Sequence, residues 1–154
     1  MLINLHNHDI RIGKHEFFER VGMVKGKEAN KLYEVVEYLY ATADVPEILK
    51  GTEWIGYVAV STDEASKNLR GRRDIVIVWR GIKTHAEKLD ALRFLPADID
   101  SLILPSPIPP PDIRGAKVEK GWLDIYTSSN PNSSLATDSA RDQVVHTNNS
   151  RSHS

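Results

Sequence analysis

Hydrophobic residues recur at helical spacing in the segment Asn30 to Thr42, NKLYEVVEYLYAT. Counted from Leu32, apolar side chains stand at i, i+3, i+4, i+7 and i+8, namely Leu32, Val35, Val36, Leu39 and Tyr40. Asp44 and Pro46 follow, and a proline disfavours a helical residue before it and lacks a backbone N–H. The pattern predicts a core helix over Asn30 to Thr42, and a shorter helical turn in HEFFERVG before it.

Two later segments predict β-strands, WIGYVAVSTD from Trp54 to Asp63 and RDIVIVWRG from Arg73 to Gly81. The second contains an unbroken apolar run, IVIVW, without polar alternation. A β-branched run of this kind is typical of a strand that is buried on both faces, in the centre of a sheet covered by helices. We therefore predict an α/β fold, in which this strand leads through a glycine turn into a short helix in KTHAEKLDALRF.

The composition changes from Leu104 onward, where PSPIPPPD predicts a stiff, extended polyproline segment. It contains one PxxP match, Pro107 to Pro110, for which a surface spacer is the favoured interpretation over a protein-binding motif. AKVEKGWLDIYTS then predicts a strand and the start of a helix, with Gly121 at the junction.

The domain organisation follows from where these patterns stop. Residues 1–128 predict one partial α/β domain, and residues 129–154, rich in Ser, Asn and Thr, predict a flexible polar tail. The tail contains the start of an amphipathic helix in SARDQVV, with Ser139 as its cap and Val144 and Val145 as its apolar residues. After these valines the apolar pattern ends, so the helix is expected to be cut short.

Composition excludes several classes of function. Twenty Lys and Arg residues balance 21 Asp and Glu residues, giving a net charge of −1, so no basic surface for nucleic acid is expected. The absence of cysteine excludes disulfides, thiolate metal sites and a cysteine nucleophile. The first residues form no apolar signal segment, and no apolar run approaches the ~20 residues that a transmembrane helix needs. We therefore expect a cytoplasmic protein without a transmembrane segment.

Candidate chemistry in the residues themselves is sparse. HNHD, from His6 to Asp9, could place two imidazoles and a carboxylate on one face of a strand, but solvated histidines are the favoured interpretation and no metal site is predicted. His85 and His146 are isolated from any serine or carboxylate at a catalytic spacing. The matches to the glycosylation pattern at Asn132 and Asn148 are chance matches in a polar tail. None of the nine glycines brackets a serine in a G-x-S-x-G elbow, which an α/β-hydrolase nucleophile requires.

A family resemblance rests on five blocks that occur in order along the chain. These are YLYAT (Tyr38 to Thr42), WIGYVAVSTDE (Trp54 to Glu64), GRRDIVIVWRG (Gly71 to Gly81), GWLDIYTS (Gly121 to Ser128) and SARDQV (Ser139 to Val144). Together they resemble the N-terminal half of the plant phospholipase A1 family, acylhydrolases of the class 3 lipase group. The resemblance implies a truncated α/β-hydrolase fold, a phospholipid or other acyl lipid as substrate, and no cofactor.

The resemblance also implies the chemistry and what is missing from it. In the family, a Ser-His-Asp triad hydrolyses the sn-1 acyl ester through an acyl-enzyme. A segment like SARDQV leads to the elbow with the nucleophile, but this chain diverges at about His146, so the triad is absent and no catalytic residue is assigned. The family also places Thr or Ser after the RG of the central strand, at the oxyanion hole. Here Ile82 stands there, with a backbone N–H but no hydroxyl, unless Thr84 substitutes.

Three hypotheses follow from these observations. The first is a phospholipase A1-like chain that is inactive alone. The second is a non-catalytic remnant or binding module that pairs with a full-length relative, and the third, independent catalysis, has the least support. Because the strand DIVIVWRG needs neighbours on both edges, we predict that the isolated chain is marginally stable, partly molten or oligomeric.

Overall fold

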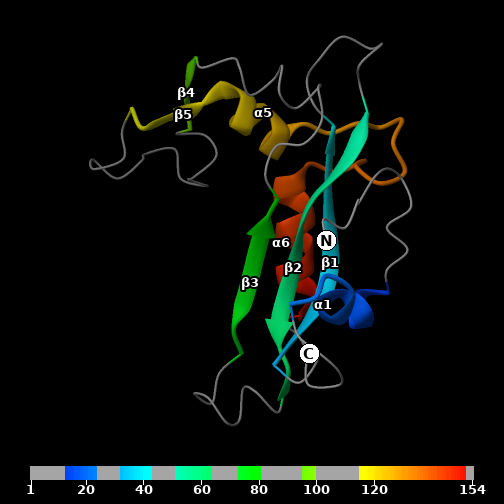
Figure 1. Ribbon diagram of the computed structural model, residues 1–154. Helices are drawn as coiled ribbons and strands as arrows, with labels where there is room; N and C mark the ends of the chain where they lie inside the picture. The colour runs from blue at the N-terminus through cyan, green and yellow to red at the C-terminus, as the bar shows by residue number, and fades with distance from the viewer. Residues whose placement is uncertain are drawn as a thin grey trace. The chain divides into compact units, whose positions relative to one another are not determined.

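The computed structural model describes residues 13–23, 32–42, 51–63, 73–80, 95–99 and 115–151 (Figure 1). Its fold is mixed α/β, with antiparallel sheets and few helices, so the predicted class is confirmed at this level. In chain order, the elements are η1 (Lys14–Glu16), α1 (Phe17–Arg20), β1 (Tyr33–Thr42), β2 (Thr52–Ser61), β3 (Ile75–Trp79), β4 (Pro96–Asp98), β5 (Lys117–Glu119), α5 (Lys120–Thr127) and α6 (Ala140–Arg151).

The described chain forms two compact units. The first contains η1, α1, β3, most of β1 and β2, and α6 from Asp142 onward. The second contains β4, β5, α5, the turns that follow α5, and the strand ends at Thr42 and Thr52. Each unit is described by itself below.

The sheet of the first unit has the strand order β1-β2-β3. β2 and β3 are antiparallel, with Gly56 opposite Trp79 and Val60 opposite Ile75. β1 and β2 are also antiparallel, because the Thr62 N–H, just after β2, donates to the Leu32 carbonyl, just before β1, at 2.9 Å. The strands predicted from Trp54 to Asp63 and from Arg73 to Gly81 are therefore confirmed as β2 and β3.

The helix predicted over Asn30 to Thr42 is wrong, because this segment forms β1. Val35 and Tyr38 belong to the same buried cluster although three residues separate them, whereas strict alternation would put them on opposite faces. Buried pairs recur every three residues along β1, at 35–36, 38–39 and 41–42. A strand with both faces buried thus imitates the i, i+3 spacing of a helix, while Tyr, Val and Thr favour the strand.

The burial predicted for the second strand is also wrong. Among the described residues β3 is an edge strand that pairs only with β2, in an antiparallel hairpin, and its side chains are largely exposed. The strand that is buried on both faces is β2, where Val58 is fully buried. Figure 1 shows α1 in front of the sheet and α6 behind it, consistent with that burial.

Side chains cover the edge of β1 that faces away from β2. The Gln143 amide of α6 accepts from the Tyr40 N–H at 3.0 Å and donates to the Tyr40 carbonyl at 2.9 Å. Lys14 Nζ donates to the Val36 carbonyl at 2.9 Å, and the Tyr38 N–H donates to Glu37 Oε1 at 3.0 Å. Four backbone groups of the edge are satisfied in this way, which prevents them from pairing with another strand.

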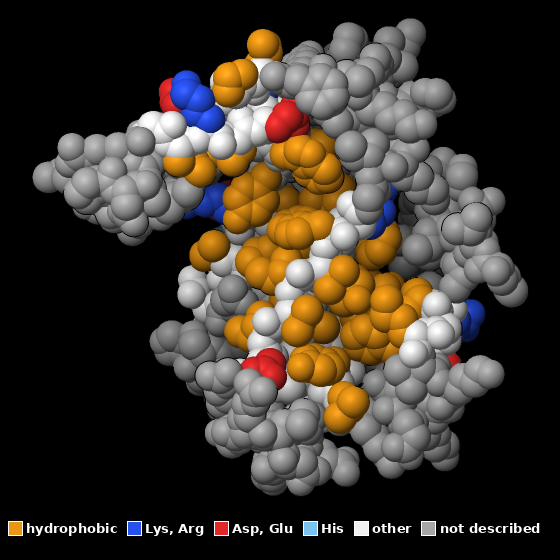
Figure 2. Space-filling model, turned by 60° about the vertical axis from the view of Figure 1, so that its left-hand side comes forward, with side chains coloured by type: hydrophobic (Ala, Val, Ile, Leu, Met, Phe, Trp, Pro, Cys, Tyr) orange, Lys and Arg blue, Asp and Glu red, His pale blue; other side chains and the backbone are white. Residues whose placement is uncertain are grey.

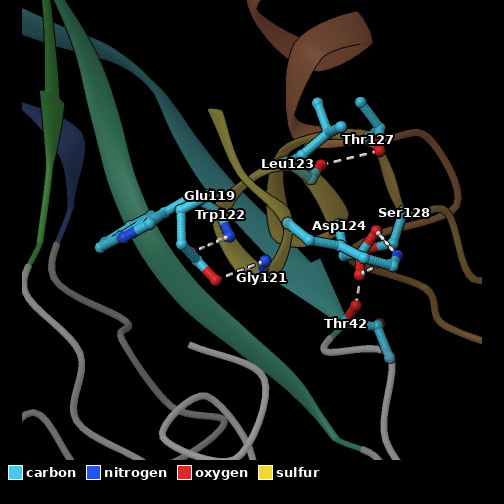
Figure 3. A network of polar contacts seen from close by, with 9 residues as sticks. Thr42, Glu119, Gly121, Trp122, Leu123, Asp124, Thr127 and Ser128 are labelled. Atoms are coloured by element: carbon cyan, nitrogen blue, oxygen red, sulfur yellow. Dashed lines mark hydrogen bonds and ion pairs between the residues drawn. The ribbon is translucent and has the colours of Figure 1, made fainter. Parts of the chain in front are cut away.

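In the second unit, β4 and β5 form a short antiparallel ladder that leads into α5. Glu119 caps α5, since its carboxylate accepts from the N–H groups of Gly121 and Trp122 at 2.9 Å each (Figure 3). After the helix, Ser128 Oγ donates to the Thr42 carbonyl at 2.6 Å. The strand and helix predicted in AKVEKGWLDIYTS are confirmed as β5 and α5.

The helix predicted to start after Ser139 is present as α6. It does not stop where the apolar pattern ends, but continues through the polar residues to Arg151. The segment predicted as a flexible tail therefore contains three turns of helix, and only the division at residue 128 stays a prediction.

Candidate functional site

The end of β3 is the part of the described structure closest in sequence to the expected oxyanion position. Arg80 follows β3, and its N–H donates to the Ile55 carbonyl at 2.8 Å. Its Nε also donates to the Trp54 carbonyl. Two hydrogen bonds from one residue thus fix the end of β3 against β2.

Gly56 brings the β2 and β3 backbones unusually close together beside this point. A Cβ at Gly56 would collide with the carbonyl oxygen of Val78, which is a backbone atom and cannot rotate away. Only glycine fits this approach without a shift of one strand. The glycine of WIGYVAV therefore fixes the distance between the strands and, with Arg80, the position of the end of β3.

An aromatic cluster supports the hairpin from one face of the sheet. Phe17 of α1 lies at the centre of it, with ring centroids 4.7 Å from Tyr57, 5.8 Å from Tyr38 and 6.4 Å from Trp54. Burial, with a smaller contribution from Tyr40, raises the pKa of Tyr38 to about 12. Burial also raises the pKa of Tyr57. These phenols stay neutral at physiological pH and serve packing, not proton transfer.

A chain of hydroxyl groups in the second unit is the other polar cluster that could carry chemistry. Thr42 Oγ1 and Thr52 Oγ1 lie 2.9 Å apart, and Thr52 Oγ1 donates to Ser133 Oγ at 2.8 Å. Ser133 Oγ also accepts from the N–H groups of Leu135 and Ala136. Because its lone pairs stabilise a turn, Ser133 is a structural residue and not a nucleophile.

The sequence-predicted site residues are mostly not placed by the structure. Ile82, Thr84, His85 and the segment from His6 to Asp9 lie outside the described residues. His146 lies on α6, at an exposed position. Within the described ranges, no group of His, Cys, Asp or Glu side chains could hold a metal ion, and no helix is long and apolar enough to cross a membrane.

Comparison with known proteins identifies relatives over most of the chain. The chain is 37% identical over 149 residues to phospholipase A1-Igamma2, chloroplastic, of Arabidopsis thaliana, which covers 88% of the chain. It is 40% identical over 132 residues to phospholipase A1 EG1, chloroplastic/mitochondrial, of rice (Oryza sativa subsp. indica), covering 77% of the chain. The chain is a relative of plant phospholipases A1. A further relative, galactolipase DONGLE, chloroplastic, of Arabidopsis thaliana, is 40% identical over 119 residues, or 73% of the chain. No family model matches the sequence.

The match covers only part of the length of each of these relatives. The chain spans 26% of the length of phospholipase A1-Igamma2, 26% of EG1 and 24% of the galactolipase. All three relatives carry an organelle in their names, chloroplastic or chloroplastic/mitochondrial. The cytoplasmic location predicted from the absence of a signal segment is therefore wrong.

The phospholipase A1 blocks read from the sequence coincide with structural elements. WIGYVAVSTDE holds most of β2, GRRDIVIVWRG contains β3 and Arg80, GWLDIYTS lies on α5, and SARDQV begins α6. Sequence reasoning missed the two anchoring residues, Arg80 and Gln143. Each stands inside one of these blocks, and that position was the one signal that could have identified them.

Proposed function

We propose that the chain contributes the hairpin and the oxyanion-side segment of a phospholipase A1-type acyl hydrolase with an α/β-hydrolase fold. The observation that carries the proposal is the similarity to plant phospholipases A1 over 88% of the chain. The substrate class is a glycerophospholipid or galactolipid, and the reaction is hydrolysis of its sn-1 acyl ester.

In this proposal the described residues act as a scaffold for the backbone after β3. Gly56 sets the approach of β2 to β3, and Arg80 holds the strand end through the Trp54 and Ile55 carbonyls. The N–H of the residue that follows Gly81 would then donate to the oxyanion of the tetrahedral intermediate. Ile82 supplies that N–H without a hydroxyl, and a missing oxyanion donor typically costs about 3 kcal/mol of transition-state stabilisation.

The 154 residues contain no G-x-S-x-G elbow, so we propose that the chain alone does not turn over esters. Purified chain should release no fatty acid from phospholipid or galactolipid vesicles. Turnover that survives extensive purification would contradict this part of the proposal.

The decisive experiment places the chain's hairpin in an active relative. Residues 54–82 replace the aligned segment of phospholipase A1-Igamma2, and sn-1 fatty acid release is measured with Ile82 and with Ile82→Thr. We expect activity with Ile82→Thr and a kcat lower by on the order of 10²–10³-fold with Ile82. A folded but inactive Ile82→Thr chimera would show that the segments are not equivalent. Equal activity of the two chimeras would show that catalysis does not need a hydroxyl at position 82.

By similarity to the three relatives, we also propose an organellar location. Imaging of a fluorescent fusion to the C-terminus of the natural gene product tests it. Signal confined to the cytosol would contradict the proposal.

The second candidate function is a non-catalytic module that pairs with a full-length relative. It is favoured by the exposed apolar side chains of β3. Affinity capture with purified phospholipase A1-Igamma2 tests this candidate, and the absence of a stable complex would reject it.

A further inference from the structure

The β4–β5 ladder of the second unit has one apolar face. Its antiparallel pairing extends beyond the two strands, because the Lys120 N–H donates to the Leu95 carbonyl at 2.9 Å. At the other end, the Ile99 N–H donates to the Ala116 carbonyl at 3.3 Å. Successive side chains of a strand alternate between the two faces, so every second residue of the ladder shares a face. One face therefore consists of apolar residues alone, namely Leu95, Ala97, Ile99, Ala116 and Val118. We call these five residues the ladder face.

The opposite side of the ladder is charged. Asp98 and Lys117 stand opposite each other in the register, and Lys117 Nζ lies 3.3 Å from Asp98 Oδ1. Glu119 shares this side with them, and its carboxylate caps α5. The ladder is thus amphipathic, with its apolar and its charged side chains separated onto two sides.

The ladder face and the helix that follows it expose large apolar side chains. The exposed fractions are 62% for Leu95, 36% for Val118 and 46% for Trp122, which lies in the first turn of α5. The Trp122 ring extends away from the axis of the helix (Figure 3). Figure 2 shows exposed hydrophobic side chains beside both basic and acidic ones near the top of the view, at the height of β4 and β5 in Figure 1.

The described charges around the ladder face nearly balance. Lys117 is paired with Asp98, and Lys120 Nζ lies 2.6 Å from Asp124 Oδ2. Glu119 faces the N-terminus of α5, whose partial positive charge offsets part of the carboxylate charge. A partner that carries a strong charge of either sign gains little from such a surface.

We propose that the ladder face and Trp122 bind the surface of an electrically neutral lipid bilayer. A stable protein interface needs roughly 20–30 residues from each partner, whereas this surface offers six. Shallow insertion into a bilayer needs only a few apolar side chains, and tryptophan is enriched where apolar and aqueous phases meet. The balanced charges favour lipids without net charge.

The proposal deepens the proposed function, since it rests on a lipid as the substrate and adds the surface that meets it. The first test is co-sedimentation of the chain with phosphatidylcholine vesicles. We expect binding that high salt does not weaken and that added phosphatidylglycerol does not strengthen. Binding that depends on phosphatidylglycerol and is lost in high salt would overturn the neutral-lipid assignment.

Matched variants show which surface is responsible. Trp122→Ala should lower the partition constant for phosphatidylcholine vesicles by about tenfold, because about half of an indole is no longer removed from water. Trp79→Ala is the control, since Trp79 lies on β3 and is 42% exposed. Leu95→Ser should also weaken binding, whereas Met23→Ser, at a position that is 64% exposed, should bind as the wild-type chain does. Circular dichroism shows whether each variant keeps the fold.

The outcomes separate this proposal from the proposed function. A wild-type chain that stays in the supernatant would overturn the proposal, and so would equal losses in Trp122→Ala and Trp79→Ala. Binding is measured without ester turnover, so an inactive Ile82→Thr chimera would count against the proposed function alone. An active chimera together with a chain that does not bind vesicles would count against the ladder face alone.

Discussion

At the scale of single residues, Gln143 shows how a side chain can replace a strand. Its amide has one donor and one acceptor, as a peptide group has, and both pair with Tyr40. A peptide of a neighbouring strand would make the same two hydrogen bonds. The contact thus satisfies the edge of β1 without adding a strand to the sheet.

Substitution of Gln143 tests this contact. Gln143→Ala removes the partners of both the Tyr40 N–H and the Tyr40 carbonyl. We therefore expect the free energy of unfolding to fall by ~1–3 kcal/mol. Urea denaturation followed by circular dichroism measures the change. Val145→Ala, at an exposed position on the same helix, is the control and should stay within about 0.5 kcal/mol of wild type. Equal effects of the two substitutions would show that the amide contributes no stability.

The tyrosines of the sheet predict how stability depends on alkaline pH. The Tyr38 phenol releases its proton at pH 10 in the unfolded chain and at about 12 in the folded chain. The folded state then binds more protons than the unfolded state, so stability is full below pH 10 and is lost as the pH rises through 12. Tyr40 and Tyr57, whose pKa values are also raised by burial, act in the same direction.

The measurement is the urea midpoint between pH 9 and pH 12, with phenolate absorbance recorded on the same samples. Tyr38→Phe removes the largest contribution and should make the decline shallower. A midpoint that does not change across this interval would show that the phenols are not protected by folding.

At the scale of elements, the start of α5 depends on a carboxylate. Glu119 accepts from two N–H groups of the first turn, which have no partner within the helix. Glu119→Ala should cost about 0.5–2 kcal/mol of stability, the usual cost of losing an N-cap. Glu119→Asp keeps an acceptor and is the control. If both substitutions destabilise equally in denaturant titrations, the cap does not support the helix.

Several elements could be predicted from the sequence because their signals are local. Glycine and polar residues bound the β-branched runs of β2 and β3, and Ser139 marks the start of α6. β1 could not be predicted, since its burial on both faces depends on contacts with α1 and β2. The exposure of β3 was missed because an apolar run shows what a strand could bury, not whether a neighbour is present.

The candidate site was predicted only in part for a similar reason. The resemblance to phospholipases A1 directed attention to Ile82, which lies outside the described residues. The anchoring by Arg80 depends on the Trp54 carbonyl, 26 residues away, and no local pattern encodes that contact. The sequence identified the block that contains Arg80, but it did not identify the Trp54 carbonyl as the partner of Arg80.

At the scale of the whole molecule, the balance of buried and exposed apolar residues predicts weak cooperativity. The core cluster of the first unit is small, and β3 leaves Ile75, Ile77 and Trp79 partly in water. The chain also divides into two compact units, which need not unfold together. We expect a broad thermal transition.

Calorimetry and circular dichroism over a dilution series measure this transition. A sharp transition from a dilute monomer, with equal calorimetric and van't Hoff enthalpies, would contradict the prediction.

The contact between Gln143 and Tyr40 has a consequence for synthesis of the chain on the ribosome. The two residues are 103 positions apart, so β1, β2 and β3 are made long before their edge is covered. At ~5–20 residues per second, the nascent β1 edge waits roughly 5–20 s for Gln143. During that interval a chaperone or a neighbouring nascent chain can occupy the edge. Yield in the cell should therefore depend on translation speed between β3 and α6, even for variants whose folded stability is unchanged.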